Sequence, residues 1–323
     1  MKDISYSVII RTTGKASEKY QQLLNSIKKL EPEPEEIIVV LPDGYSEPKE
    51  QLGVEKFYFS PKGMVVQRMT GIEKCKSRYA LICDDDVCFG SDFVQKLYEP
   101  VCQGLCVFSA GPLYSFLPAG KGALVDLVMG NAAPTLFHRN RYVSIMRTSG
   151  YTYNRHLKQE VRYYETQSAA WTCFFADIQA LKDIDFGAEC WLDSHGYSAL
   201  DDQTMFYKAY LRDLKTMIVV DAVYEHLDAK TSTRNNKPTT LYSMAYNRVV
   251  FWNRFIYELQ PNAILRCWSR LCFAYKNFMT VLYENVSLMV GKQSKEDHKI
   301  IKNGRTDGWR YVRSEEYLSL PPV

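Results

Sequence analysis

Several patterns that would define a protein class at once are missing from this sequence. None of its nine cysteines forms a Cys-x-x-Cys pair or a spacing typical of a metal site, and their number is odd. This cysteine usage argues against a disulfide framework and favours a reducing cytoplasm. No stretch reaches the ~18 apolar residues that a membrane-spanning helix needs. The sequence also contains no internal repeat and no low-complexity segment.

An excess of charge of one sign is missing as well. The 40 basic and 37 acidic residues leave a formal net charge of +3, which is too small to indicate a nucleic-acid partner. Residues 1–5 run directly into a strand-like segment, so we expect no signal peptide and a cytoplasmic protein. Hydrophobic residues make up 46% of the 323 positions, enough for one large domain with an extension or for two domains.

The first third of the chain alternates between strand-like and helix-like patterns. Short apolar runs predict strands at 6–10, 36–41, 57–59 and 79–83, and apolar residues at helical spacing predict helices at 17–30 and 63–76. This alternation favours an α/β fold with a mostly parallel sheet flanked by helices. Residues 112–165 are rich in Tyr, Arg, Gly and Asn and predict long loops over a binding face.

The pattern becomes regular again after these predicted loops. We expect strands at 169–176 and 217–220, a short helix from 177 to 181 and a helix from 200 to 210. Long helices are expected from Thr240 onward.

Three consecutive carboxylates, Asp84, Asp85 and Asp86, follow the buried strand at 79–83. They therefore lie at the carboxyl edge of the sheet, where ligands bind in open α/β folds. Three adjacent like charges are costly unless a cation offsets their repulsion, and Mg²⁺ and similar ions prefer carboxylate oxygens. The sequence predicts a metal and phosphate site here, with a solvated acidic turn as the alternative.

A second acidic pair, Asp201 and Asp202, opens the predicted helix at 200–210. Asp201 could serve as a helix cap, which is a purely structural role. His226 follows the last predicted core strand and is a candidate metal ligand, with an ordinary loop histidine as the alternative.

Taken in order, these segments resemble a bacterial inverting glycosyltransferase of the GT-A fold, of the family 2 type. Val8 to Thr13 is similar to that family's first strand and nucleotide-binding turn, and Gln67 to Ile72 to its Gln-Arg-Asn-x-Gly-Ile helix, with Met69 in place of Asn. Asp84 to Val87 matches the family's Asp-x-Asp metal motif, and Asp201-Asp202 its later acidic pair. The resemblance covers about residues 5 to 230.

The resemblance implies roles for individual residues. It places Asp202 as the catalytic base and Asp201 as its orienting partner, and makes Asp86 and His226 ligands of Mn²⁺ or Mg²⁺. The residues it assigns to the nucleotide sugar are Arg11, Thr12, Asp43, Arg68, Asp84 and Asp85, although Asp43 requires a shift of the motif.

The implied reaction transfers a sugar from a nucleotide-diphosphate sugar to a hydroxyl of a glycan or lipid-linked glycan, as in capsule or lipopolysaccharide synthesis. A sugar nucleotidyltransferase would share the sheet and the metal acids, and a non-catalytic nucleotide-sugar or carbohydrate-binding protein is the non-enzyme alternative. A P-loop is excluded because Ile9 occupies the position of its first glycine, five residues before Gly14-Lys15.

We expect residues 1–237 to form the catalytic domain and residues 238–323 a helical extension. The segment 230–237, with Arg234, could be a loop that closes over the diphosphate or a solvated basic linker. Residues 264–290 are strongly apolar but interrupted by four charged residues, Arg266, Arg270, Lys276 and Glu284. Such a helix could lie peripherally on the inner face of the cell membrane or pack on the catalytic domain.

Overall fold

The structure is a computed structural model, and it describes residues 4–112, 128–129, 141–154, 161–228 and 236–323. Most of the predicted closing loop, residues 230–235 with Arg234, lies outside these described residues, as does part of the predicted loop region 112–165.

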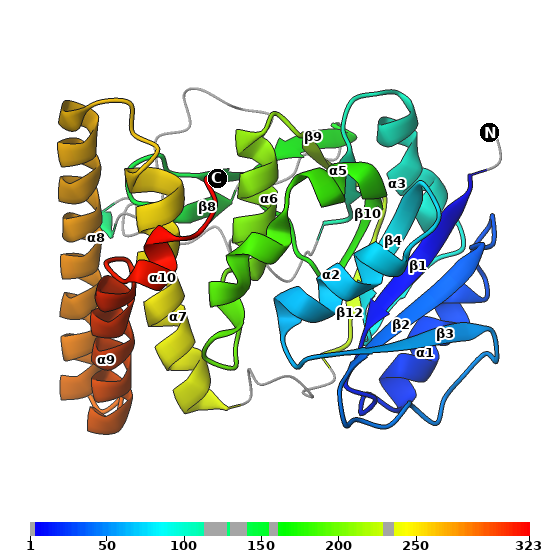
Figure 1. The fold of residues 1–323 in the computed structure, drawn as a ribbon, viewed down its shortest axis with the longest axis horizontal. Helices are drawn as coiled ribbons and strands as arrows, with labels where there is room; N and C mark the ends of the chain where they lie inside the picture. Colours follow the sequence, from blue (N-terminus) through cyan, green and yellow to red (C-terminus); the bar gives the residue numbers. More distant parts are fainter. Residues whose placement is uncertain (1–3, 113–127, 130–140, 155–160, 229–235) are drawn as a thin grey trace.

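An eight-stranded mixed sheet forms the centre of the molecule (Figure 1). The first four strands of the order given below are parallel to one another. Of the other four, β10 and β9 run antiparallel to their neighbours, whereas β6 and β11 between them are parallel to each other. In spatial order they are β3 (Glu55–Ser60), β2 (Glu36–Pro42), β1 (Tyr6–Arg11), β4 (Tyr79–Asp84), β10 (Cys173–Asp177), β6 (Phe108–Ala110), β11 (Thr216–Val219) and β9 (Tyr163–Thr166). The predicted α/β class is confirmed, and β4, which carries the first aspartate, lies between β1 and β10.

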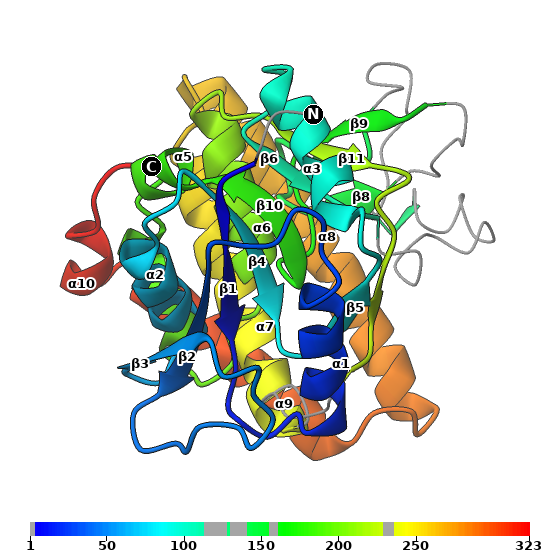
Figure 2. The ribbon, with the colours of Figure 1, turned by 90° about the vertical axis from the view of Figure 1, so that its right-hand side faces the viewer.

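Helices cover both faces of the sheet because the strands are apolar on both sides. Val8 and Ile10 of β1 belong to the cluster that packs with α1 (Glu18–Ile27) and α3 (Phe93–Cys102). Ile9 between them belongs to the opposite cluster, with α2 (Met64–Lys74), α5 (Ile178–Asp183) and α6 (Asp201–Leu211). Figure 2 shows α1 and α2 on opposite sides of the sheet.

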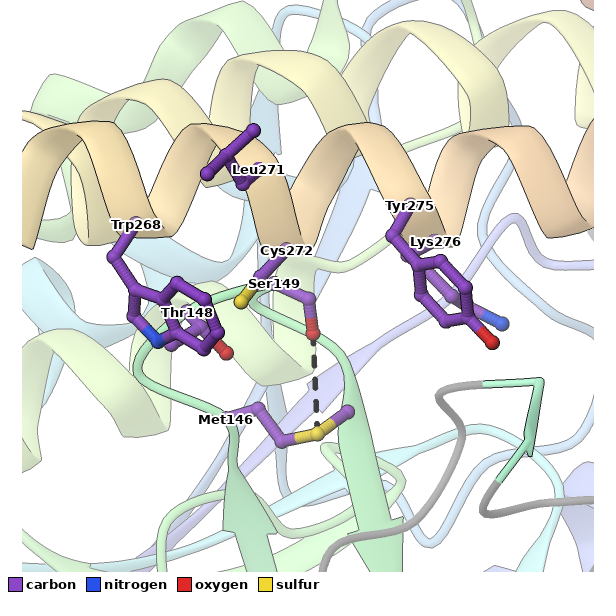
Figure 3. A pocket seen from close by; sticks show the side chains of 8 residues that line it. All are labelled: Met146, Thr148, Ser149, Trp268, Leu271, Cys272, Tyr275 and Lys276. Carbon is purple, nitrogen blue, oxygen red and sulfur yellow. Dashed lines mark hydrogen bonds between the residues drawn. The ribbon is translucent and has the colours of Figure 1, made fainter.

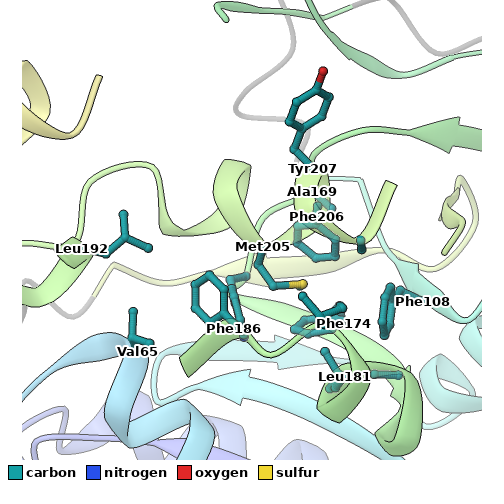
Figure 4. Close-up of a cluster of buried hydrophobic side chains, with 14 of the residues drawn as sticks. Val65, Phe108, Ala169, Phe174, Leu181, Phe186, Leu192, Met205, Phe206 and Tyr207 are labelled. Carbon is teal, nitrogen blue, oxygen red and sulfur yellow. The ribbon is translucent and has the colours of Figure 1, made fainter. Parts of the chain in front are cut away.

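The cluster that contains Ile9 includes many aromatic side chains. Phe174 of β10 packs edge-on against Phe206 of α6, with ring centroids 5.2 Å apart (Figure 4). The ring centroid of Trp171 lies 4.9 Å from that of Phe186. Phe186 begins the 3₁₀ segment η2 (Phe186–Asp193), so this packing fixes both η2 and α6 against the sheet.

The C-terminal part is helical, as predicted. It consists of α7 (Lys237–Trp252) with a π-helical end, η4 (Asn253–Tyr257), followed by α8 (Ala263–Met289), α9 (Lys295–Tyr311) and α10 (Glu315–Leu318). Helices α7 and α9 pack closely: a Cβ at Gly304 would lie 2.5 Å from the carbonyl oxygen of Tyr242. Helix α8 lies at the outer edge of the molecule (Figure 1). In the described part of the chain, no helix is long and apolar enough to cross a membrane.

Some short elements differ from the sequence expectation. The region 112–165, predicted as loops, contains the hairpin of β7 (Val143–Ile145) and β8 (Thr152–Asn154) and the start of β9. A separate two-stranded sheet joins β5 (Val87–Phe89) to β12 (Tyr224–His226). This small sheet matters for the site, because it brings His226 next to the aspartates.

Candidate active site

The carboxyl ends of β1 and β4 hold the first aspartate in an ion pair. The parallel register places Arg11 beside Asp84, and Nη2 of Arg11 lies 3.0 Å from Oδ1 of Asp84. Arg68 of α2 approaches the same oxygen, with Nη2 at 3.5 Å. Two guanidinium groups therefore converge on one carboxylate at the sheet edge.

Asp85, the next residue, is buried. The Thr12 hydroxyl donates a hydrogen bond of 2.5 Å to Oδ2 of Asp85. Burial raises the pKa of Asp85 to about 6, and the charge of Asp86 adds to that rise, whereas the Thr12 hydrogen bond opposes it. Asp85 thus ties the turn after β1 to the end of β4.

Asp86 lies beside His226 because β5 and β12 pair with Val87 opposite His226. Nε2 of His226 is 3.2 Å from Oδ1 of Asp86, and this hydrogen bond raises the pKa of His226 despite its burial. Two atoms that bind one octahedral cation at right angles, each about 2.1 Å from it, are about 3.0 Å apart. The Asp86–His226 pair therefore fits a divalent cation, although no group of three His, Cys, Asp or Glu ligands occurs among the described residues.

Helix α2 positions Arg68 under close constraint. A Cβ at Gly71 would lie 2.5 Å from Cγ2 of Ile9, so only glycine lets the helix approach β1 this closely. At its start, the backbone N–H groups of Met64 and Val65 donate to the Asp193 carboxylate at 2.8 and 3.0 Å. This carboxylate takes the place of a helix cap, because Gly63 has no side chain to supply one.

Arg68 also joins the two acidic groups of the sequence. Its guanidinium stacks 4.3 Å above the Trp171 ring and, besides contacting Asp84, forms an ion pair through Nη1 with Asp201. The Asp201 side chain is therefore directed at Arg68. The cap residue of α6 is Leu200, which makes no side-chain cap hydrogen bond, so the capping role considered for Asp201 is not what the structure shows.

The two carboxylates of the pair have opposite pKa shifts. Burial alone would raise the pKa of Asp201, but the Arg68 charge and hydrogen bonds from Asp202 and Arg68 outweigh it and lower the pKa. Burial raises the pKa of Asp202 well above its usual value, and the neighbouring Asp201 raises it further. Carboxylates with pKa values pushed apart by their environment are typical of acid–base sites.

A cavity of about 250 Å³ opens beside Arg11. Several of its lining residues are basic or aromatic: Lys15 and Lys62 lie 4.9 and 6.0 Å from the centroid of the Tyr45 ring. The remaining lining residues are Thr13, Pro42, Gly63, Met64, Gln67, Asp193, Gly196 and Ser198. This combination suits a phosphorylated ligand with a planar ring.

The structure brings together most of the residues predicted from the sequence. Ion pairs and hydrogen bonds connect five of them: Arg11, Arg68, Asp84, Asp201 and Asp202. Thr12 is hydrogen-bonded to Asp85, and Asp86 pairs with His226. Asp43 is exposed, and its neighbours Pro42 and Tyr45 line the cavity instead. Three residues of the cavity, Lys15, Tyr45 and Lys62, were not predicted from the sequence. The positions of Lys15 and Tyr45 just after the first two strands could have indicated them.

Comparison with known proteins identifies the family. Residues 7–184, about half of the chain, match the sequence profile of Glycosyl transferase family 2. No curated protein sequence matches the chain.

Solved structures resemble the whole fold. S. aureus TarS, residues 1–349, superimposes with a TM-score of 0.54 at 14% identity, covering 96% of this chain and 81% of that one. The same protein in complex with UDP-GlcNAc gives 0.52 at 14% identity, covering 96% and 82%. GalNAc-T7 with UDP, GalNAc and Mn²⁺ gives 0.53 at 13% identity, covering 88% and 58%. At these identities the likeness concerns the fold alone.

Proposed function

The chain belongs to glycosyl transferase family 2 and is a glycosyltransferase of the GT-A fold, and on this premise we propose that it transfers a sugar with inversion from a nucleotide-diphosphate sugar to an acceptor hydroxyl. The observation that carries the proposal is the bridge made by Arg68, which contacts Asp84 of the strand edge and Asp201 of the acidic pair. Donor site and candidate base are thereby parts of one connected site.

The donor nucleotide is assigned to the cavity beside Arg11. Arg11 and Lys15 supply positive charge for the diphosphate, and the Tyr45 ring supplies a surface on which a nucleobase can stack. Thr12, Asp84 and Asp85 shape the edge of this site, and Asp43 is kept as a contact of the nucleoside. Arg68 orients Asp84 through their contact at 3.5 Å.

Asp86 and His226 are assigned to a divalent cation, Mn²⁺ or Mg²⁺. When bound, such an ion neutralises charge on the diphosphate leaving group. An imidazole ligand is more natural for Mn²⁺ than for Mg²⁺. GalNAc-T7, which has a similar fold, was crystallised with Mn²⁺.

Asp202 is assigned as the base that removes the proton from the acceptor hydroxyl. Its raised pKa makes its carboxylate a better proton acceptor than an ordinary aspartate once it is ionised. Asp201, held by Arg68, keeps its charge beside it. A single base on the side opposite the leaving group gives direct displacement, so the anomeric configuration inverts.

We assign donor binding and the base to residues 1–237 and the acceptor side to the helical residues 238–323. The acceptor is a glycan or lipid-linked glycan, in the synthesis of a bacterial surface polysaccharide, and the protein works in the cytoplasm on the inner face of the membrane. The wide apolar surface of α8 supports this peripheral contact.

A panel of nucleotide sugars that includes UDP-GlcNAc, each with Mn²⁺, with Mg²⁺ and with EDTA, tests the proposed function. We expect slow, metal-dependent hydrolysis of one donor, seen as release of its nucleoside diphosphate. Release of pyrophosphate from a nucleoside triphosphate and a sugar phosphate would instead indicate a sugar nucleotidyltransferase. Donor binding without any hydrolysis or transfer would indicate a carbohydrate-binding protein.

A further inference from the structure

Helices that flank the sheet differ in whether they reach the candidate active site. Helix α8 borders an apolar pocket of about 390 Å³ beside the turn that joins β7 to β8, and Figure 3 shows Trp268 and Tyr275 extending from α8 towards that turn. The residues that line this pocket are not those of the candidate active site. Helix α1, by contrast, follows the carboxyl end of β1 and contacts the chain next to His226.

Lys19, in the first turn of α1, binds the backbone just beyond β12. Its Nζ donates a hydrogen bond of 2.6 Å to the carbonyl oxygen of Leu227 and a second one to the carbonyl oxygen of Asp228. No carboxylate forms an ion pair with Lys19 in the part of the chain that the structure describes. The charge of Lys19 is thus directed at two backbone oxygens, and hydrogen bonds from a charged donor are roughly twice as strong as neutral ones.

The position of Lys19 is unfavourable for α1 itself. The N-terminal end of a helix carries partial positive charge, so a cation in the first turn is repelled. Lys19 is also half-buried, which restricts a long and flexible side chain. The contacts with Leu227 and Asp228 offset these two costs, so the lysine at this position serves the neighbouring chain and not the helix.

The chain that Lys19 binds has little other support. Strand β12 has three residues in a two-stranded sheet with β5, and His226 is its last residue. Sheets of only two strands are marginally stable. Just beyond the strand, Asp228 has a φ of 50°, a left-handed conformation that strains a residue other than glycine. We therefore expect this end of β12 to depend on contacts from outside the small sheet.

Leu227 connects Lys19 to both proposed metal ligands. Its N–H donates a hydrogen bond of 2.7 Å to the carbonyl oxygen of Asp86, and its own carbonyl accepts from Lys19. It also directly follows His226, whose Nε2 lies 3.2 Å from Oδ1 of Asp86. Lys19 thereby fixes the backbone from which the His226 imidazole extends.

Helix α1 is itself fixed to the other strand of the small sheet. The N–H of Phe89 in β5 donates to the hydroxyl of Ser26 at 3.3 Å, and Val87 and Tyr224 belong to the same apolar cluster as the buried side of α1. Figure 2 shows α1 beside β5. Ser26 lies near one end of α1 and Lys19 near the other, so the helix holds β5 and the end of β12 at the same time.

We propose that Lys19 is a positioning residue for the divalent cation. By fixing the backbone at Leu227 and Asp228, it holds the His226 imidazole where it can bind the ion together with Asp86. The inference rests on the proposed metal-dependent function and adds a residue that touches neither the ion nor the substrate. Without Lys19 the end of β12 has to be ordered when the ion binds, so the affinity for the ion decreases.

Calorimetric titration of the full-length protein with UDP tests this inference through the Mn²⁺ dependence, the ratio of UDP affinities with and without Mn²⁺. Lys19→Met should reduce the Mn²⁺ dependence about tenfold and leave UDP affinity without Mn²⁺ and the thermal midpoint near wild type. Lys19→Arg can still donate to both carbonyls and should restore part of the loss. Lys29→Met, an exposed lysine just beyond the other end of α1, is the matched control and should change neither affinity.

A double-mutant cycle shows whether Lys19 acts through His226. If it does, Lys19→Met should change the Mn²⁺ dependence by less than about twofold in a His226→Ala background. Pulsed EPR of the complex with Mn²⁺ and UDP detects a coordinated imidazole nitrogen directly. We expect this nitrogen signal in the wild type, a weaker one in Lys19→Met and none in His226→Ala.

The same samples separate a failure of this inference from a failure of the metal assignment. A Mn²⁺ dependence that falls in His226→Ala but not in Lys19→Met would overturn the role of Lys19 alone. An equal loss from Lys19→Met in both backgrounds would overturn it too, because Lys19 would then act on a group other than His226. An unchanged Mn²⁺ dependence in His226→Ala would refute the metal assignment, and with it the inference.

Discussion

Asp201 and Asp202 are adjacent carboxylates whose surroundings shift their pKa values in opposite directions. Of the two, only Asp201 forms an ion pair with Arg68, so Asp201 keeps its charge, whereas burial and the neighbouring charge raise the pKa of Asp202. The raised pKa of Asp202 means that it holds its proton to a higher pH than an ordinary aspartate. We therefore expect transfer to increase with pH as Asp202 ionises.

The same pKa shift predicts an effect on stability. An unfolded aspartate releases its proton near pH 3.9. The folded Asp202 keeps its proton longer, so the stability of the wild type decreases as the pH rises through the folded pKa. Asparagine is neutral throughout and keeps the shape. The thermal midpoint of Asp202→Asn should thus exceed that of the wild type by a margin that grows with pH, as scanning calorimetry from about pH 5 to pH 8 can show.

Asp201→Asn is the matched control for this measurement. It removes the partner of a buried Arg68, so its thermal midpoint should decrease. A thermal midpoint of Asp202→Asn below the wild type at every pH would show that Asp202 is ionised and stabilising in the folded protein.

The metal site makes a separate prediction. Asp86→Ala removes one of the two proposed ligands at a sheet edge, so the fold should persist while the Mn²⁺-dependent part of UDP affinity falls by about 10–100-fold or more. Calorimetric titration with UDP, with and without Mn²⁺, measures this Mn²⁺-dependent part of the affinity. Asp92→Ala is the control, because Asp92 is an exposed aspartate just before α3 whose side chain pairs with Lys96. Unchanged Mn²⁺ dependence in Asp86→Ala would remove Asp86 from the metal site.

At the scale of helices and strands, the sequence predicted the elements that are long or strongly apolar. Strands β1, β2 and β4 and helices α1, α2 and α6 lie within about three residues of their predicted ends, because buried strands and amphipathic helices have clear periodicity. Helix α3 and strand β6 were not predicted. Helix α3 contains Pro100, and β6 has only three residues, too few for a periodic pattern.

Helix α8 shows why periodicity alone can mislead at this scale. Its pattern indicates an amphipathic helix correctly, but not which side faces the protein. In the structure the polar side is buried and the apolar side exposed, since Lys276 and Glu284 find partners within the molecule.

This orientation predicts membrane binding that surface substitutions can remove. The wild type should sediment with phosphatidylglycerol vesicles and much less with phosphatidylcholine vesicles. Replacing Phe278 and Met289 by serine removes exposed apolar area of α8 and should reduce sedimentation several-fold with an unchanged thermal midpoint. Val54→Ser and Val223→Ser, exposed elsewhere, are controls. Equal sedimentation of the α8 variant and the wild type would place the membrane contact elsewhere or exclude it.

Over the whole molecule, the C-terminal helices and the sheet share one core. Glu189 of η2 is fully buried and forms ion pairs with Lys208 of α6 at 2.7 Å and with Arg254 at 2.8 Å. Arg254 also donates a hydrogen bond of 2.7 Å to the carbonyl oxygen of Pro321. One buried cluster thus connects the end of the chain to the helix that carries Asp202. Removing only one member of such a cluster leaves a buried charge unpaired, which typically costs ~3–5 kcal/mol.

The candidate site could be predicted only in part from the sequence. The aspartates at 84–86 and 201–202 follow local patterns, so they were found as candidates. The contacts between them depend on Arg68, which reaches both only because Gly71 allows α2 to approach β1. The cavity residues Lys15, Tyr45 and Lys62 come from three separate loops, and no local pattern joins them.

Turnover of Asp202→Asn, measured with donor affinity on the same sample, tests the central claim most directly. The asparagine keeps the shape but cannot accept the acceptor's proton, so transfer should fall by about two to four orders of magnitude. UDP and Mn²⁺ affinity should remain near the wild-type value, because the loss concerns the proton transfer alone. Near-normal turnover in Asp202→Asn would contradict the account and show that another group is the base.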